Sequence, residues 1–112
     1  MTYQEVNSMI KTAGIPCAYY QFEEESGQQP PFITFYFQDS DDMMADNINY
    51  QTIRPLTIEL YTDNKNFALE ALLEEILKAH DLTFSRTETY IQSEKMYMVA
   101  YYTEVLINGE QN

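Results

Sequence analysis

Apolar residues recur along this chain at two spacings, one typical of helices and the other typical of strands. Four of them near the N-terminus fall on one side of a helix: Tyr3, Val6, Met9 and Ile10. Thr2 and Glu5 stand three residues apart at its start, which is the pattern of a capping box. Gly14 and Pro16 follow, and both residue types end helices. The pattern predicts a first helix with a single apolar stripe.

A second helix is predicted in the leucine-rich segment that ends at His80. Asp63, Asn64 or Asn66 can cap its start, since each side chain can accept a backbone hydrogen bond. Helical spacing assigns five residues to its buried side: Leu69, Leu72, Leu73, Ile76 and Leu77. Four charged residues are assigned to its solvent side, where Glu74 and Lys78 are expected to pair: Glu70, Glu74, Glu75 and Lys78.

Five segments rich in β-branched and aromatic residues predict strands: 17–22, 32–37, 50–62, 82–91 and 95–107. In the third segment Leu56, Ile58 and Leu60 point to one side of a sheet, so Thr57 and Glu59 point to the other. The segments 32–37 and 95–107 are apolar or aromatic on both sides. A sheet containing them has two sides to cover.

The order of helix, three strands, helix and two strands predicts an α+β fold. We expect a two-layer sandwich, with an antiparallel or mixed sheet of about five strands and both helices on one face. Gly27 and the pair Pro30–Pro31 indicate a hairpin connection between the first two strands. At 112 residues the chain is expected to be a single domain, 1–112, with a frayed tail at 108–112.

Eighteen acidic residues against six basic ones give a net charge of −12. Phosphate backbones and anionic membrane surfaces repel such a chain, so we expect neither sequence-specific nucleic-acid binding nor membrane association. No apolar run approaches the roughly 20 residues that span a bilayer. The single cysteine, Cys17, cannot form an internal disulfide, which indicates a reducing compartment. We therefore expect the protein in the cytosol where it is made.

Reactive side chains do not group into a recognisable catalytic pattern. His80 has no serine or cysteine close to it in sequence, and Cys17 is interpreted as a small core residue. The acidic loop at 39–46 lacks the glycine and the final glutamate of an EF-hand. No phosphate loop, dinucleotide fingerprint, nucleophile elbow or zinc ligand set is present. The sequence predicts a protein that is not an enzyme and has no cofactor and no metal site.

The aromatic content exceeds what two helices can cover. Tyr, Phe and Met are enriched at the centres of protein interfaces, so the surplus predicts contact with another copy of the chain. We assign this subunit interface to five residues of the two apolar strands: Phe35, Phe37, Tyr97, Val99 and Tyr101. The alternative is a monomer that tolerates exposed tyrosines.

Three stretches carry a family resemblance: "ADNINY", "IELYTDNKNFALE" and "ETYIQSEKMYMVAYYTEV". They resemble the small tail-completion, or tail-terminator, proteins of long-tailed phages and prophages of Gram-positive bacteria. The resemblance implies a two-layer α+β fold and a homo-oligomeric ring of subunits, expected to be a hexamer, that caps the tail tube and helps join tail to head. It implies a tail-tube protein and a head–tail connector protein as partners, and no catalytic residues. It places the protein in the host cytoplasm during assembly and at the head–tail junction of the virion.

Two acidic loops are expected to face the lumen of this ring of subunits or a partner, where negative charge lets DNA pass without sticking. Their residues are Glu23, Glu24, Glu25, Asp39, Asp41, Asp42 and Asp46. Two other functions stay open. A small acidic regulatory module that mimics DNA would be a monomer with evenly spread carboxylates, and an enzyme would depend on His80 and neighbouring acids.

Overall fold

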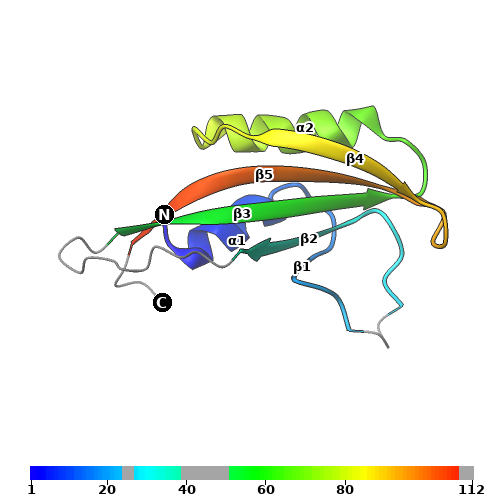
Figure 1. Cartoon of the computed structure of the whole chain (residues 1–112), viewed down its shortest axis with the longest axis horizontal. Helices are drawn as coiled ribbons and strands as arrows, with labels where there is room; N and C mark the ends of the chain where they lie inside the picture. The colour runs from blue at the N-terminus through cyan, green and yellow to red at the C-terminus, as the bar shows by residue number, and fades with distance from the viewer. Residues whose placement is uncertain (24–26, 39–50, 109–112) are drawn as a thin grey trace.

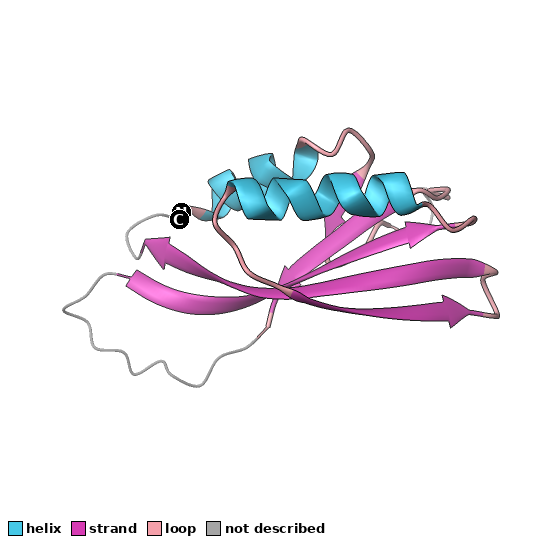
Figure 2. Cartoon of the chain, turned by 90° about the horizontal axis from the view of Figure 1, so that it is seen from above, coloured by secondary structure: helices cyan, strands magenta, loops and turns pink. Residues whose placement is uncertain are grey.

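The chain folds as one five-stranded sheet with two helices, and the computed structural model describes residues 1–23, 27–38 and 51–108. The elements in chain order are α1 (Tyr3–Lys11), β1 (Cys17–Tyr19), β2 (Phe32–Phe37), β3 (Gln51–Thr62), α2 (Phe67–Ala79), β4 (Ser85–Ile91) and β5 (Met96–Asn108) (Figure 1). Across the sheet the strand order is β1-β2-β3-β5-β4. Both helices lie on the same side of the sheet (Figure 2). The predicted α+β sandwich with a mixed sheet is confirmed.

The two longest strands form the spine of the sheet. β3 and β5 are antiparallel and pair over twelve residue pairs, from Gln51 with Asn108 to Thr62 with Tyr97. β2 pairs with the other edge of β3, and the β4–β5 hairpin completes the sheet beyond β5. Since α2 connects β3 to β4 and β5 then returns between them, α2 is positioned over the β5 side of the sheet.

The predicted hairpin between the first two strands is wrong, because β1 and β2 are parallel. β1 ends after three residues, and Tyr20 adopts a left-handed conformation with φ 72°. The backbone N–H of Tyr20 still donates to the Phe35 carbonyl at 2.8 Å, after which the chain leaves the sheet. The segment from 20 to 31 therefore returns the chain to the start of β2 rather than reversing it in a tight turn.

Helix α1 begins as its sequence indicates. The Glu5 N–H donates to the Thr2 hydroxyl at 3.0 Å, and the Thr2 N–H donates to the Glu5 carboxylate at 2.9 Å. Both bonds satisfy backbone donors that a helix start leaves free, so the capping box is confirmed. Gly14, with φ 82°, turns the chain away just after the helix ends.

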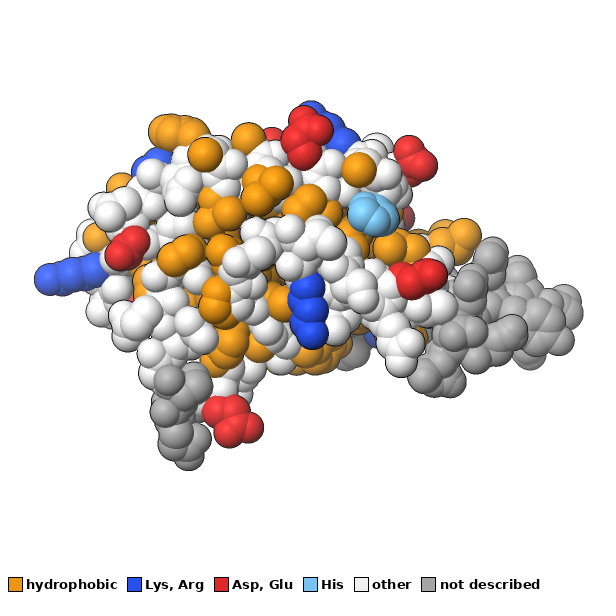
Figure 3. Space-filling view, turned by 180° about the vertical axis from the view of Figure 1, so that it is seen from behind, with side chains coloured by type: hydrophobic (Ala, Val, Ile, Leu, Met, Phe, Trp, Pro, Cys, Tyr) orange, Lys and Arg blue, Asp and Glu red, His pale blue; other side chains and the backbone are white. Residues whose placement is uncertain are grey.

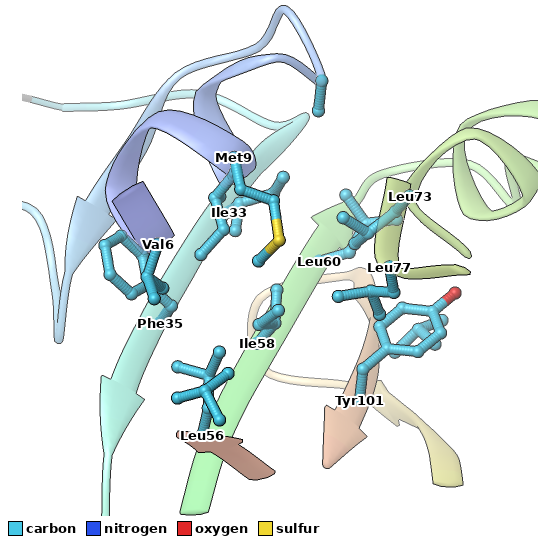
Figure 4. Packing of buried hydrophobic residues seen from close by; sticks show 14 of the residues in the cluster. Val6, Met9, Ile33, Phe35, Leu56, Ile58, Leu60, Leu73, Leu77 and Tyr101 are labelled. Carbon is cyan, nitrogen blue, oxygen red and sulfur yellow. The ribbon is translucent and has the colours of Figure 1, made fainter. Parts of the chain in front are cut away.

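Helix α2 begins at the Asn66 cap, whose side-chain oxygen accepts the Leu69 N–H at 3.0 Å. Leu73 and Leu77 are buried, and with Met9 of α1 they converge on the sheet around Ile58 and Leu60 (Figure 4). Two predictions for α2 are wrong. Leu72 was assigned to the core but is 43% exposed, while Glu70 was assigned to solvent but is only 3% exposed.

None of the helices in the described part of the chain has the length and apolar character needed to cross a membrane.

Candidate functional site

Within residues 1–23, 27–38 and 51–108, no helix covers the side of the sheet that faces away from α1 and α2 (Figure 2). Strand alternation sends Leu56, Ile58 and Leu60 toward the helices and the residues between them outward. We call this outward side the open face. Its residues come from four strands: Phe32, Thr34, Tyr36, Ile53, Pro55, Thr57, Glu59, Tyr61, Ser85, Thr87, Thr89, Ile91, Met96, Met98, Ala100, Tyr102, Glu104 and Leu106.

Cross-strand pairing arranges the open face in rows. A row of small and polar side chains runs from Thr34 through Glu59 and Ala100 to Thr87. One flanking row consists of Phe32, Tyr61, Met98 and Thr89, and the other of Tyr36, Thr57, Tyr102 and Ser85. Large apolar side chains therefore border a polar centre, which is also the arrangement in which side chains opposite each other stabilise a sheet.

The polar centre is internally hydrogen-bonded. The Tyr61 hydroxyl donates to Oε1 of Glu59 at 2.9 Å, and the Thr34 hydroxyl donates to the same oxygen at 3.1 Å. Burial raises the pKa of Tyr61, and the adjacent Glu59 carboxylate raises it further, so the phenol keeps its proton and serves as a donor. A carboxylate held by two donors is a poor general base, and the group is better suited to fixing the tyrosine ring in place.

Aromatic rings stack at the β2 end of the open face. Phe32 and Tyr61 stack with centroids 4.8 Å apart, and Tyr20 and Tyr36 stack at 5.0 Å. Phe22 meets Phe32 edge-on at 5.3 Å. All of these rings except Tyr36 line an open groove of about 500 Å³ that continues to Ile91, Glu94 and Met96. A shallow groove lined by rings is suited to binding an apolar surface rather than enclosing a reaction.

The five residues assigned to a subunit interface from sequence lie on the opposite, helix-covered side of the sheet. Phe35, Val99 and Tyr101 are buried in the core of the chain itself, and Phe37 and Tyr97 are half-buried on the same side. The assignment is wrong for the three buried residues, because the other residue parity of β2 and β5 faces outward, and for Phe37 and Tyr97 it stays a prediction. The sequence marks the outward parity only weakly: β5 places Val99, Val105 and Ile107 at the buried parity, but Tyr97 and Tyr101 lie there too.

Of the seven acidic loop residues expected to face the lumen or a partner, one lies in the described part of the chain. Glu23 is exposed beside the aromatic groove. The remaining members of the proposed acidic surface lie outside the described residues: Glu24, Glu25, Asp39, Asp41, Asp42 and Asp46.

A charged cluster that the sequence analysis missed joins α2 to β4. Lys65 contacts Glu70 at 2.5 Å and Glu88 at 2.8 Å, while Arg86 contacts Glu70 at 3.1 Å and Glu74 at 2.8 Å. Helical spacing predicts that Glu74 pairs with Lys78, but Glu74 pairs with Arg86 instead. The sixth member of the cluster is Tyr101, whose hydroxyl donates to Glu74 at 2.9 Å.

Electrostatics keep this cluster in its charged form. Hydrogen bonding by Lys65 lowers the pKa of Glu88. Burial opposes the charge on Lys65, but the hydrogen bonds and charges of Glu70 and Glu88 outweigh it and raise its pKa. For Tyr101, burial and then the Glu74 carboxylate raise the phenol pKa. Each of the three carboxylates contacts at least one of the two cations, so the cluster acts as a clamp between helix and sheet.

Neither His80 nor Cys17 lies in a catalytic arrangement within the described part of the chain. Nδ1 of His80 lies 2.9 Å from the Ile76 carbonyl, as expected for a side chain that closes a helix. Cys17 is half-buried, and burial raises the pKa of its thiol, which disfavours the reactive thiolate. Within residues 1–23, 27–38 and 51–108, histidine, cysteine, aspartate and glutamate form no group of three that could hold a metal ion.

Comparison with protein families finds no matching family model, and comparison with characterised proteins finds no significant match.

Proposed function

We propose that this chain is a structural assembly protein that shelters its open face against other copies of itself. The observation that carries the proposal is the exposure of large apolar side chains on one contiguous side of the sheet. Tyr102 is 39% exposed there, and Leu106 and Ile53 are also exposed, directly opposite each other on β5 and β3. Exposed apolar surface of this extent commonly marks a protein interface.

The dimensions of the sheet support the proposal. Four strands at about 4.8 Å spacing and a 12-residue strand rising about 3.3 Å per residue give a face of roughly 20 by 40 Å at its widest. A standard interface takes about 800 Å² from each partner, and the open face approaches this size, since β2 and β4 extend along only part of β3 and β5. Its Tyr and Met side chains are the kinds that interface centres favour.

The biological setting follows from the sequence resemblance. The stretches "IELYTDNKNFALE" and "ETYIQSEKMYMVAYYTEV" cover the join of β3 to α2 and the β4–β5 hairpin. These elements build the centre of the sheet and its clamp. We propose that the protein completes a phage tail as a ring of subunits, a hexamer by the resemblance, bound to the tail tube and the head connector. It would then act in the host cytoplasm and remain at the head–tail junction of the virion.

Native mass spectrometry of the purified chain, alone and with the tail-tube protein of the same phage, tests this function. We expect a defined homo-oligomer, formed by the chain alone or on addition of tail-tube protein. A matched pair of variants adds specificity: Met98→Glu charges the open face, whereas Gln4→Glu adds the same charge on exposed α1. A chain that stays monomeric in every mixture contradicts the proposal and favours the acidic binding module.

A further inference from the structure

The side of α2 that faces away from the sheet is unusually apolar. Seven residues of the helix are exposed on this side: Phe67, Ala68, Ala71, Leu72, Glu75, Lys78 and Ala79. Five of the seven are apolar, and Phe67 is the most exposed at 72%. Figure 3 views the helix layer and shows hydrophobic side chains spread over it, including the region of α2.

An amphipathic helix on a protein surface normally turns a polar side to water. α2 instead is apolar on both sides, because Leu73 and Leu77 fill the core beneath it. Apolar residues gathered on the outward side of a helix are typical of a surface that another surface covers. The alanines at 68 and 71 would let another surface approach the helix backbone closely, and the Phe67 ring stands out beside Lys65, whose Nζ lies 4.9 Å from the ring centroid.

The outward side of α2 and the open face lie on opposite sides of the molecule (Figure 2). One chain cannot bring them together, since the sheet and the helix core stand between them. Two copies can, if the helix layer of one meets the sheet of the next. Such a head-to-tail contact uses a different patch on each partner, and it builds a closed ring of subunits where the rotation between copies closes and an open filament where it does not.

Charge distinguishes this contact from one between two open faces. Among the described strand positions the open face carries Glu59 and Glu104 and no basic residue. The helix side carries five basic residues: Lys11, Arg54, Lys65, Lys78 and Arg86. Seven acidic residues belong to the same elements or flank α2: Glu5, Asp63, Glu70, Glu74, Glu75, Asp81 and Glu88.

Two open faces pressed together would therefore bring four carboxylates into one interface without a cation. Like charges placed opposite each other in this way oppose association. A helix layer that carries cations reduces that repulsion against an acidic sheet and brings Lys78, which is exposed, toward the open face.

We propose that the outward side of α2 in one copy packs on the open face of the next copy, so that each sheet is covered on both sides by helices. This inference rests on the self-association argued under Proposed function, and it names the surface that occupies the open face.

Cysteine cross-linking tests the arrangement. In a Cys17→Ala parent, one variant carries Ala71→Cys on the outward side of α2 and another carries Thr89→Cys on the open face, both at exposed positions. A short bifunctional maleimide is added to each variant alone and to their mixture. We expect cross-linked dimers in the mixture and little product from either variant alone. A single chain carrying both cysteines should give a ladder of larger products.

Two other results overturn the proposal. Efficient cross-linking of Thr89→Cys alone means that open faces meet each other, and efficient cross-linking of Ala71→Cys alone means that helices do. If native mass spectrometry shows oligomers but no sample cross-links, a different pair of surfaces is in contact, and only this inference falls. If no oligomer forms by any measurement, the proposed function falls with it.

A variant that adds a carboxylate to the outward side of α2 tests the arrangement independently. Leu72→Glu should weaken self-association by about tenfold or more, because the contact would bury an unpaired carboxylate. Ser8→Glu adds the same charge to the exposed side of α1 and should leave association within about twofold of the parent. Thermal unfolding of both variants at low concentration verifies that the monomer fold is kept. Equal association of the two variants contradicts the inference.

Discussion

Arg86 on β4 and Glu70 on α2 form an ion pair in which Nη2 of Arg86 lies 3.1 Å from Oε1 of Glu70. The Glu70 side chain is almost fully buried, although it belongs to a helix position that spacing assigns to solvent. Lys65 contacts the other oxygen of the same carboxylate. Glu70 is tolerated at this depth because both of its oxygens are paired with cations.

Removing both cations should therefore be costly. We expect the double variant Lys65→Met/Arg86→Met to lose about 3–5 kcal/mol of unfolding free energy, since an uncompensated charge is left buried. Adding Glu70→Leu to that variant should recover most of the loss. Denaturant unfolding at neutral pH measures both effects. A double variant within about 1 kcal/mol of the parent would show that Glu70 does not depend on its cations.

The neighbouring leucines of α2 should differ sharply in their contribution to stability. Leu73→Ala empties a buried site and should cost about 2–5 kcal/mol. Leu72→Ala removes a side chain from the exposed side and should cost less than about 1 kcal/mol in the monomer. Chemical denaturation at a concentration where the chain is monomeric compares them. Equal losses would mean that the helix is rotated relative to this structure.

Acid should weaken the clamp through Glu88. Its pKa is lowered in the folded state, chiefly by the hydrogen bond from Lys65, so the unfolded chain binds its proton more readily. The contribution of Glu88 is present above its unfolded pKa of about 4.3 and is lost as the pH falls through the lower folded value. The melting temperatures of the parent and Glu88→Gln should differ at pH 7 and converge in acid. A difference that persists unchanged in strong acid would exclude this linkage.

Alkali should destabilise the chain through Tyr61 and Tyr101. Both phenols have raised pKa values in the folded state, first from burial and then from a neighbouring carboxylate. The unfolded chain loses these protons near pH 10 while the folded chain keeps them, so stability falls as the pH rises above about 10. Unfolding measured across that range should show a shallower alkaline fall for Tyr61→Phe/Tyr101→Phe than for the parent. Parallel curves would contradict it.

Local signals in the sequence predict much of this fold. The capping box of Thr2 and Glu5 and the alternation of Leu56, Ile58 and Leu60 depend only on neighbouring residues, and both are confirmed. Helical spacing assigns Leu72 and Glu70 to the wrong sides of α2. Apolar residues occur on both sides of this helix, so spacing alone does not define its buried side. What decides it is the pairing of Glu70 with Lys65 and Arg86, which come from outside the helix.

The candidate site depended on one further fact that lies outside local patterns. Segments 32–37 and 95–107 are apolar at both parities, so the sequence indicates a surplus without showing which parity the helices cover. The pairing of Ile33 with Leu60 and of Leu60 with Val99 shows which parity the helices cover. The same limit applies to β1, where a three-residue strand leaves too little pattern to distinguish parallel from antiparallel pairing.

Hydroxyl-radical footprinting across a range of protein concentrations measures most directly whether the open face is sheltered by assembly. As oligomers form, Met96, Met98 and Tyr102 should lose reactivity, while Met9, which is already buried in the monomer, should stay unreactive throughout. Unchanged reactivity of all three open-face residues in a sample that is demonstrably oligomeric would contradict the account.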